Sequence, residues 1–272
     1  MARYTVIGAS GFVGARLVAA LAADGLEVFV PVRDDPRLFT EDLGQVFYCA
    51  GLTADYLARP FDTVEAHVTL IARILKDARF ERLVYCSSTR LYDWMGPEAG
   101  AEDAPLSLTP SEPRHLYDLS KALGENLCLT QGGGRAAVAR LACVWDWSDG
   151  APGFLSEWLQ KARRNRSLAL DSSSGYVRDY IHLDDTVAAL RAIVDSDQSA
   201  IFNVASGENV SNGDLAATFM ACGWTVALSR TTPVQAAPHC DIARLRALGV
   251  EPVPVRQAIA SRLRQEDFFE AG

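Results

Sequence analysis

Short apolar strands alternate with amphipathic helical stretches along the first half of this chain. Strand-type runs occupy 3–7, 27–33, 45–51, 82–88 and 135–144, and helix-type runs occupy 12–24, 62–78 and 113–129. Strands joined through helices run parallel, and a parallel sheet needs helices over both of its faces. The alternation therefore predicts an α/β fold, a Rossmann-type doubly wound parallel sheet.

The pattern loosens after about residue 145, where helices are predicted at 153–165, 184–195, 239–250 and 255–265, a strand at 200–205 and a loop at 171–180. We expect residues 1–145 to form the Rossmann core, completed by segments around 178–205. Residues 146–177 and 206–272 are expected to form a small C-terminal substrate lobe. The link between the second and third strand-type runs is very short, so the usual third strand and its helix are predicted to be truncated.

Composition excludes some classes of partner. The chain has 272 residues, half of them apolar, and a net charge of −8, which argues against nucleic acid or an anionic membrane as the main partner. No apolar run approaches about 20 residues and the N-terminus enters a strand directly, so a cytoplasmic protein is expected. The six scattered cysteines and four histidines show no metal-ligand spacing, and no metal is predicted.

The segment 8-GASGFVG-14 joins the first strand to the first helix. In that context Gly8 permits a tight turn, Gly11 lets the backbone approach a pyrophosphate, and Gly14 lets the helix pack close to the strand. The start of the helix offers free N–H groups and a positive dipole end to an anion. A dinucleotide is the predicted ligand.

A second motif, 117-YDLSK-121, lies in the helix predicted at 113–129 and contains one of only three lysines in the chain. The spacing i, i+4 places Tyr117 and Lys121 on one helix face. By itself such a pair also fits a solvated helix face.

Seven segments in order, GASGFVG, VFYCAG, VYCSSTRLY, YDLSK, RLACVW, RDYIHLDD and FNVASGE, resemble the extended branch of the short-chain dehydrogenase/reductase superfamily, the NAD-dependent epimerase/dehydratase type. The resemblance covers nearly the whole chain. It implies that Tyr117 is the general acid/base and that Lys121 lowers its pKa and binds the nicotinamide ribose. Ser88, four residues before Tyr92, is implied to hold the substrate oxygen, with Ser87 and Thr89 as weaker alternatives.

The resemblance also implies the cofactor contacts. An acidic residue that would bind the ribose of NAD is replaced by Val32, and Arg33 follows, so NADP is favoured over NAD. Asp34 and Asp35 stand against this, because either could neutralise Arg33 or bind the ribose of NAD. The predicted cofactor-binding residues are Gly8, Ser10, Gly11, Phe12, Val13, Gly14, Arg33, Ala50, Gly51, Ser87, Tyr117, Lys121 and Ala142.

Substrate contacts are implied for Ser88, Tyr92, Cys143 and Arg178. Arg178 matches an arginine that binds nucleotide-sugar phosphates, although a salt bridge to Asp179 or Asp184 is the competing interpretation.

Three departures from the family pattern bear on function. Asparagine is usual in the family where Cys143 and His67 stand. The Asp-Glu pair that follows the hydroxyl in the family's dehydratases is replaced by Thr89 and Arg90, so dehydration is disfavoured.

The sequence thus predicts an NAD(P)-dependent oxidoreductase or epimerase that transfers hydride at a carbinol or keto carbon of a sugar, nucleotide-linked in the favoured interpretation. A ketoreductase for a non-sugar metabolite and a non-catalytic redox sensor are the alternatives. The helices predicted at 62–78 and 113–129 have apolar positions spaced three and four apart. The resemblance implies that they pair across a two-fold axis in a homodimer, unless these positions only face the sheet.

Overall fold

Six parallel strands form the central sheet. In the computed structural model, which describes residues 3–93 and 95–265, the strand order is β2-β1-β3-β4-β5-β9. The order reverses between β1 and β3, as in a doubly wound Rossmann sheet, and this confirms the predicted fold class. The bounds are β1 (Arg3–Ile7), β2 (Glu27–Phe29), β3 (Gln45–Tyr48), β4 (Arg82–Ser88), β5 (Ala136–Leu141) and β9 (Ile201–Val204).

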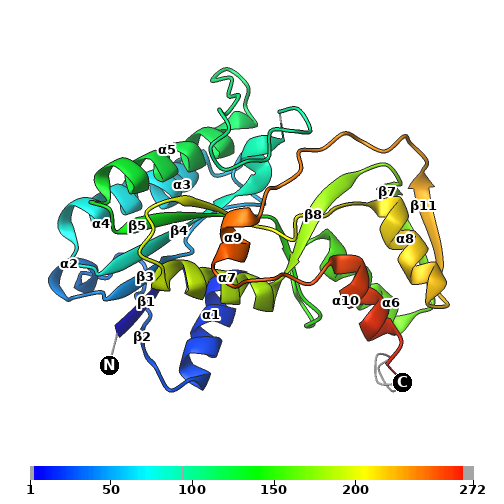
Figure 1. The fold of residues 1–272 in the computed structure, drawn as a ribbon, viewed down its shortest axis with the longest axis horizontal. Coiled ribbons are helices and arrows are strands. Elements are labelled where there is room, and N and C mark those ends of the chain that lie inside the picture. The colour runs from blue at the N-terminus through cyan, green and yellow to red at the C-terminus, as the bar shows by residue number, and fades with distance from the viewer. Residues whose placement is uncertain (1–2, 94, 266–272) are drawn as a thin grey trace.

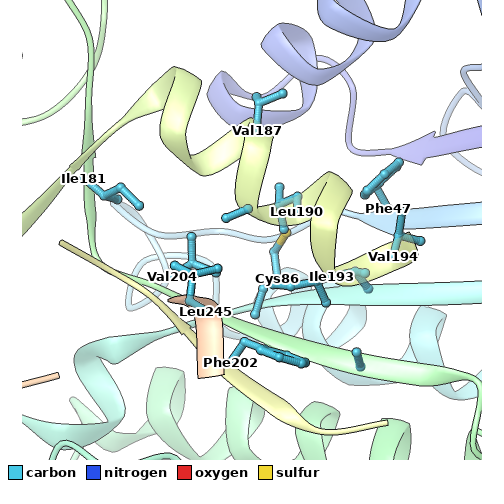
Figure 2. Close-up of a cluster of buried hydrophobic side chains, with 14 of the residues drawn as sticks. Phe47, Cys86, Ile181, Val187, Leu190, Ile193, Val194, Phe202, Val204 and Leu245 are labelled. Carbon is cyan, nitrogen blue, oxygen red and sulfur yellow. The ribbon is translucent and has the colours of Figure 1, made fainter. Parts of the chain in front are cut away.

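Helices cover both faces of this sheet (Figure 1). On one face lie α1 (Phe12–Ala23) and α7 (Leu183–Asp195), and on the other lie α5 (His115–Gln131) and the helical run that contains α3 (Pro60–Val64) and α4 (Leu70–Asp77). Figure 2 shows how α7 packs, with Leu190 and Ile193 pointing toward Cys86 of β4 and Phe202 of β9. The sheet is therefore buried on both sides, which explains why its strands are nearly all apolar.

The sheet edge beside β2 is shortened. Between β2 and β3 the described chain holds only the four-residue helix α2 (Arg37–Thr40), and β2 pairs with β1 alone. Asp35 shapes this link, because its carboxylate accepts bonds from the backbone N–H of Arg37 (3.0 Å) and from its guanidinium (3.0 and 2.7 Å). The predicted truncation of the third strand and its helix is confirmed.

The helix predicted over 62–78 is interrupted. A π-helical turn, η1 (Glu65–Thr69), separates α3 from α4. Such turns are rare, and many occur at functional sites. Here the turn carries His67, whose side chain is fully buried.

A second cluster of buried apolar side chains forms beyond β6 (Cys143–Trp145), centred on Trp158, Phe219 and Trp224. It is enclosed by α6 (Phe154–Arg164), α8 (Asn212–Ala221), α10 (Val255–Leu263), the sheet β10-β8-β6 and the pair β11-β7 (Figure 1). The added strands are β7 (Ser167–Ser173), β8 (Val177–His182), β10 (Asn209–Ser211) and β11 (Thr225–Arg230).

Two local predictions in this half are wrong. The segment 171–180 is not a loop, because it contains the end of β7 and most of β8. The helix expected over 239–250 is only α9 (Ala243–Ala247), and Ile242 and Leu245 pack in the large cluster at β9 rather than in the second one. Within the described ranges, no helix is both long and apolar enough to cross a membrane.

Candidate active site

A cavity of about 540 Å³ opens at the carboxyl ends of the central strands. It lies at the reversal of strand order between β1 and β3, the place where open α/β sheets bind ligands. Its walls come from the glycine turn before α1, from β4, from α5 and from the second half of the chain around β6 and β8. Both halves of the molecule therefore contribute to one site.

The glycine turn has little room for side chains. Gly8 has φ +87°, and a Cβ there would lie 2.6 Å from the backbone nitrogen of Ala50 at the end of β3. A Cβ on Gly14 would lie 2.4 Å from the carbonyl oxygen of Gly8. The first glycine thus permits both the conformation and the close approach of two strand ends, and the third lets α1 start against the turn.

The N-terminus of α1 fits the pyrophosphate of a dinucleotide. Its N-cap is Gly11, which provides no side-chain cap, and its first turn has no acidic residue. Residues 11–14 line the cavity, so free N–H groups and the positive dipole end face it. The buried hydroxyl of Ser87 also lines the cavity and has no hydrogen-bond partner among the described residues, so it is free to bind a ligand.

Helix α5 brings Tyr117 and Lys121 to the cavity on one face. The Lys121 ammonium is buried, donates to the carbonyl oxygen of Cys86 at 2.7 Å and lies 4.9 Å from the ring centroid of Tyr85. Burial lowers the pKa of Lys121 to about 8. A Cβ on Gly51 would lie 3.3 Å from this ammonium, so the small residue at the end of β3 leaves room for it.

The surroundings of Tyr117 act in opposite directions on its pKa. Burial raises the pKa of this phenol, while the Ser88 side chain, the charge of Arg90 and the Thr53 side chain lower it. The Arg90 guanidinium lies 4.6 Å from the Tyr117 ring centroid. Arg90, rather than Lys121, is therefore the cation with the largest lowering effect on this pKa.

Ser88 ends β4 and starts the 3-10 turn η2 (Thr89–Tyr92), where its Oγ accepts the backbone N–H of Arg90 at 3.3 Å. The neighbouring Thr89 hydroxyl donates to the carbonyl oxygen of Leu141 at 3.4 Å. Of the three candidate hydroxyls, that of Ser88 lowers the pKa of Tyr117.

His67 connects the turn after β3 to α5. Its Nε2 accepts the backbone N–H of Leu52 at 3.2 Å, so Nδ1 carries the proton and donates to the Ser120 hydroxyl at 2.8 Å. Ser120 in turn donates to the backbone carbonyl of Tyr117 at 2.8 Å. Burial, followed by the charge of Lys121, lowers the pKa of His67 to about 2, so the ring is neutral.

Most predicted site residues meet at this cavity. Its lining includes Gly11, Phe12, Val13, Gly14, Gly51, Ser87, Ser88, Tyr92, Tyr117, Lys121, Ala142, Cys143 and Arg178. Gly8 and Ala50 lie behind the lining, against each other. Ser10 and Arg33 are exposed outside it.

The hydroxyl of Tyr92 is turned into the core. It donates to Asn203 Oδ1 at 2.8 Å and accepts from Arg140 at 2.7 Å, and Arg140 forms a buried salt bridge with Glu125 at 2.6 Å. A substrate contact by Tyr92 would therefore use its ring.

Arg178 pairs with neither carboxylate considered from the sequence. Its guanidinium lies 3.7 Å from Asp93 and 4.4 Å from the ring centroid of Tyr176. Asp179 accepts bonds from Ser206 and Gly207 instead. Asp184 pairs with Arg16 at 3.0 Å.

Sequence reasoning missed positive roles for three residues. Thr53 lies in a loop without periodicity, so no signal pointed to it. Arg90 and His67 were noticed only as departures from a family pattern, and their contacts depend on packing between distant segments. Within the described ranges no group of three or more His, Cys, Asp and Glu side chains could hold a metal.

A model of the NAD dependent epimerase/dehydratase family matches residues 4–205. The chain belongs to this family. A dTDP-4-dehydro-6-deoxy-D-allose reductase of Streptomyces bikiniensis is similar to this family member, with 24% identity over 95% of the chain and 94% of the reductase.

Two solved structures share the fold of this epimerase/dehydratase family member. MoeE5, solved with UDP-glucose and NAD, is 20% identical with a TM-score of 0.75, over 96% of this chain and 97% of that one. The UDP-glucose 4-epimerase of Thermotoga maritima, solved with UDP-glucose, is 18% identical with a TM-score of 0.77, over 95% and 96%.

Proposed function

We propose that the protein is an NAD(P)-dependent reductase or epimerase that acts on a carbinol or keto carbon of a nucleotide-linked sugar. The observation that carries this proposal is one cavity with an anion-binding helix start on one side and Ser88, Tyr117 and Lys121 on the other. The reductase and the epimerase similar to this chain act on sugars of this class, as their names state.

The chain's own residues supply the proton chemistry. When bound, the nicotinamide supplies or accepts a hydride at the substrate carbon. Ser88 holds the oxygen on that carbon, and Tyr117 gives its proton to the oxygen during reduction or takes it during oxidation. Lys121 is proposed to bind the nicotinamide ribose. Arg90 stabilises the phenolate that Tyr117 becomes after donating its proton.

Dehydration is disfavoured by the two residues that follow Ser88. Elimination of water needs a carboxyl acid and base near the reacting carbon. Thr89 offers a hydroxyl that is bonded to the backbone, and Arg90 offers a cation.

For substrate recognition we propose that Arg178 binds a phosphate of the nucleotide. It lines the cavity, is part-buried, and its contact with Asp93 is long at 3.7 Å, so a guanidinium edge is available for a bidentate phosphate contact. Cys143 lies on the same wall.

NADP is the proposed cofactor, ahead of NAD. Arg33 is exposed and forms no salt bridge among the described residues. Asp35, one of the two residues that could have neutralised it, bonds to Arg37, which holds the pKa of the Asp35 carboxyl at about 2. The 2′-phosphate of NADP would meet Arg33 at the open sheet edge.

The remaining proposals concern organisation. The Rossmann core of 1–145 with 178–205 and the lobe of 146–177 and 206–272 are proposed as the two functional parts, except that Ile242 and Leu245 pack with the core. A homodimer through α3–α4 and α5 is supported by the exposure of Phe61 (88%) and Leu123 (48%). The cytoplasmic location remains a prediction from sequence.

The proposal is tested by mass spectrometry of the purified protein for retained dinucleotide, followed by turnover of 4-keto and 4-hydroxy nucleotide sugars. Retained cofactor with interconversion of epimers supports an epimerase, and loosely bound cofactor with net reduction supports a reductase. Reduction of simple ketones without turnover of any nucleotide sugar would favour the ketoreductase alternative. Cofactor binding without turnover of any substrate would favour the sensor.

A further inference from the structure

Arg90 stands at the reacting end of the cavity, beside the tyrosine whose phenolate it is proposed to stabilise. Its guanidinium lies over the ring of Tyr117 at 4.6 Å and over that of Tyr56 at 5.3 Å, and the residue lines the cavity. Its backbone N–H bonds to the hydroxyl of Ser88. Arg90 is thus bonded through its backbone to Ser88, and its guanidinium lies over the ring of Tyr117. These are the two residues proposed to hold the reacting oxygen.

Among residues 3–93 and 95–265, Arg90 has no ion-pair partner. Of the other arginines at this end, Arg114 contacts Asp93 at 2.5 Å, and Arg178 makes a longer contact of 3.7 Å with the same carboxylate. Across the described residues no carboxylate lies within salt-bridge distance of Arg90.

The charge of Asp118 contributes to raising the pKa of Arg90, but Asp118 forms no salt bridge with it among the described residues. It is buried in α5, and neither of its oxygens has a hydrogen-bond partner among the described residues. Burial raises the pKa of Asp118, which disfavours its charged form.

We propose that Arg90 forms a subsite for a carboxylate carried by the substrate on the carbon next to the reacting one. The inference rests on the proposed function and narrows it to sugar acids of the uronic type. Two oxygens of a carboxylate match the paired N–H groups of a guanidinium, and such charge-assisted pairs are strong where water is partly excluded.

The position of Arg90 indicates which carbon of the substrate would carry the carboxylate. In the proposed function the reacting oxygen is held between Ser88 and Tyr117, and the Arg90 guanidinium lies 4.6 Å from the centroid of the same tyrosine ring. A group that touches Arg90 while the oxygen is held must therefore lie close to the reacting carbon. A neutral substituent would leave the partly buried cation uncompensated, so a sugar acid should be preferred over the neutral sugar.

The test compares binding of UDP-glucuronic acid and UDP-glucose, by calorimetry, to the protein saturated with dinucleotide. Wild type is expected to bind the acid about ten- to a hundredfold more tightly, as charged hydrogen bonds of this kind provide. Arg90→Met should lose that preference and keep its affinity for UDP-glucose, while Arg90→Lys should retain part of it. Arg178→Met is the matched control and should weaken both ligands equally.

Equal affinity of wild type for the two ligands, or an undiminished preference in Arg90→Met, would overturn the subsite. If wild type binds neither UDP sugar, the nucleotide part of the proposed function fails. The subsite is then tested by itself, by comparing the effects of sodium glucuronate and of glucose on the melting temperature. A rise in melting temperature with glucuronate in wild type but not in Arg90→Met supports it, and equal responses of the two proteins overturn it.

Discussion

Two cations approach the tyrosine of α5 in different ways. Lys121 is buried one turn along the helix and directs its ammonium to the carbonyl of Cys86, whereas Arg90 covers the tyrosine ring from η2. The motif 117-YDLSK-121 located the first of these, because i, i+4 spacing is a local property. The second depends on the fold of a different segment, so spacing alone did not reveal it.

His67 gives the clearest pH prediction at this scale. A histidine whose folded pKa is about 2 binds fewer protons when folded than when unfolded, where its pKa is about 6.5. Its contribution to stability is therefore intact above pH 6.5 and is lost as the pH falls below that value. Between pH 7 and pH 5, wild type should lose about 2 kcal/mol of unfolding free energy relative to His67→Asn.

Urea unfolding at a series of pH values measures this difference. His239→Asn, which removes an exposed histidine, is the control and should run parallel to wild type. Parallel curves for wild type and His67→Asn would refute the neutral, buried state of His67.

At the scale of elements, long amphipathic runs and fully apolar strands were predictable from sequence. The run at 82–88 is β4 and the run at 12–24 is α1 within one residue. The π-helical turn η1 was not predicted, because the spacing over 62–78 predicts one continuous amphipathic helix. It contains His67, which bonds to Leu52 and Ser120 on other segments of the chain.

The shortened sheet edge leads to the cofactor prediction. Arg33→Ala should weaken NADP binding about tenfold or more, because one charge-assisted contact to the 2′-phosphate is removed. NAD lacks that phosphate, so its affinity in the same variant is the internal control and should stay unchanged. Fluorescence titration with both reduced dinucleotides measures this. Tighter binding of the NAD form by wild type, or an unaltered NADP affinity in Arg33→Ala, would show that the strand end does not select the cofactor.

At the scale of the whole molecule, the cavity needs both halves of the chain, and the second half was predicted least well. Strands β7 and β8 were missed because β7 pairs with β11 and β8 with β6 and β10, partners remote in sequence. The local signal there, 171-DSSSG-175, is typical of a turn. The wall that carries Arg178 was therefore predicted from family resemblance and not from periodicity.

Association can be tested on the exposed apolar face of α5. Leu123→Glu places a charge in the middle of the proposed dimer interface and should shift a dimer to a monomer at micromolar concentration, as measured by sedimentation velocity. Met220→Glu, at an exposed position of α8, is the matched control and should leave the dimer intact. A wild-type monomer under these conditions would contradict the dimer proposal.

The central claim is that Tyr117 exchanges the proton while hydride moves at the substrate carbon. The most direct measurement is the single-turnover rate of reduction of a 4-keto nucleotide sugar by wild type and by Tyr117→Phe, with dinucleotide affinity measured on both proteins. Because the variant keeps the ring and removes only the hydroxyl, its rate should fall about 10²- to 10⁴-fold while it binds dinucleotide as wild type does. A variant that reduces the substrate at nearly the wild-type rate would contradict the assignment of Tyr117 and the account of the site built around it.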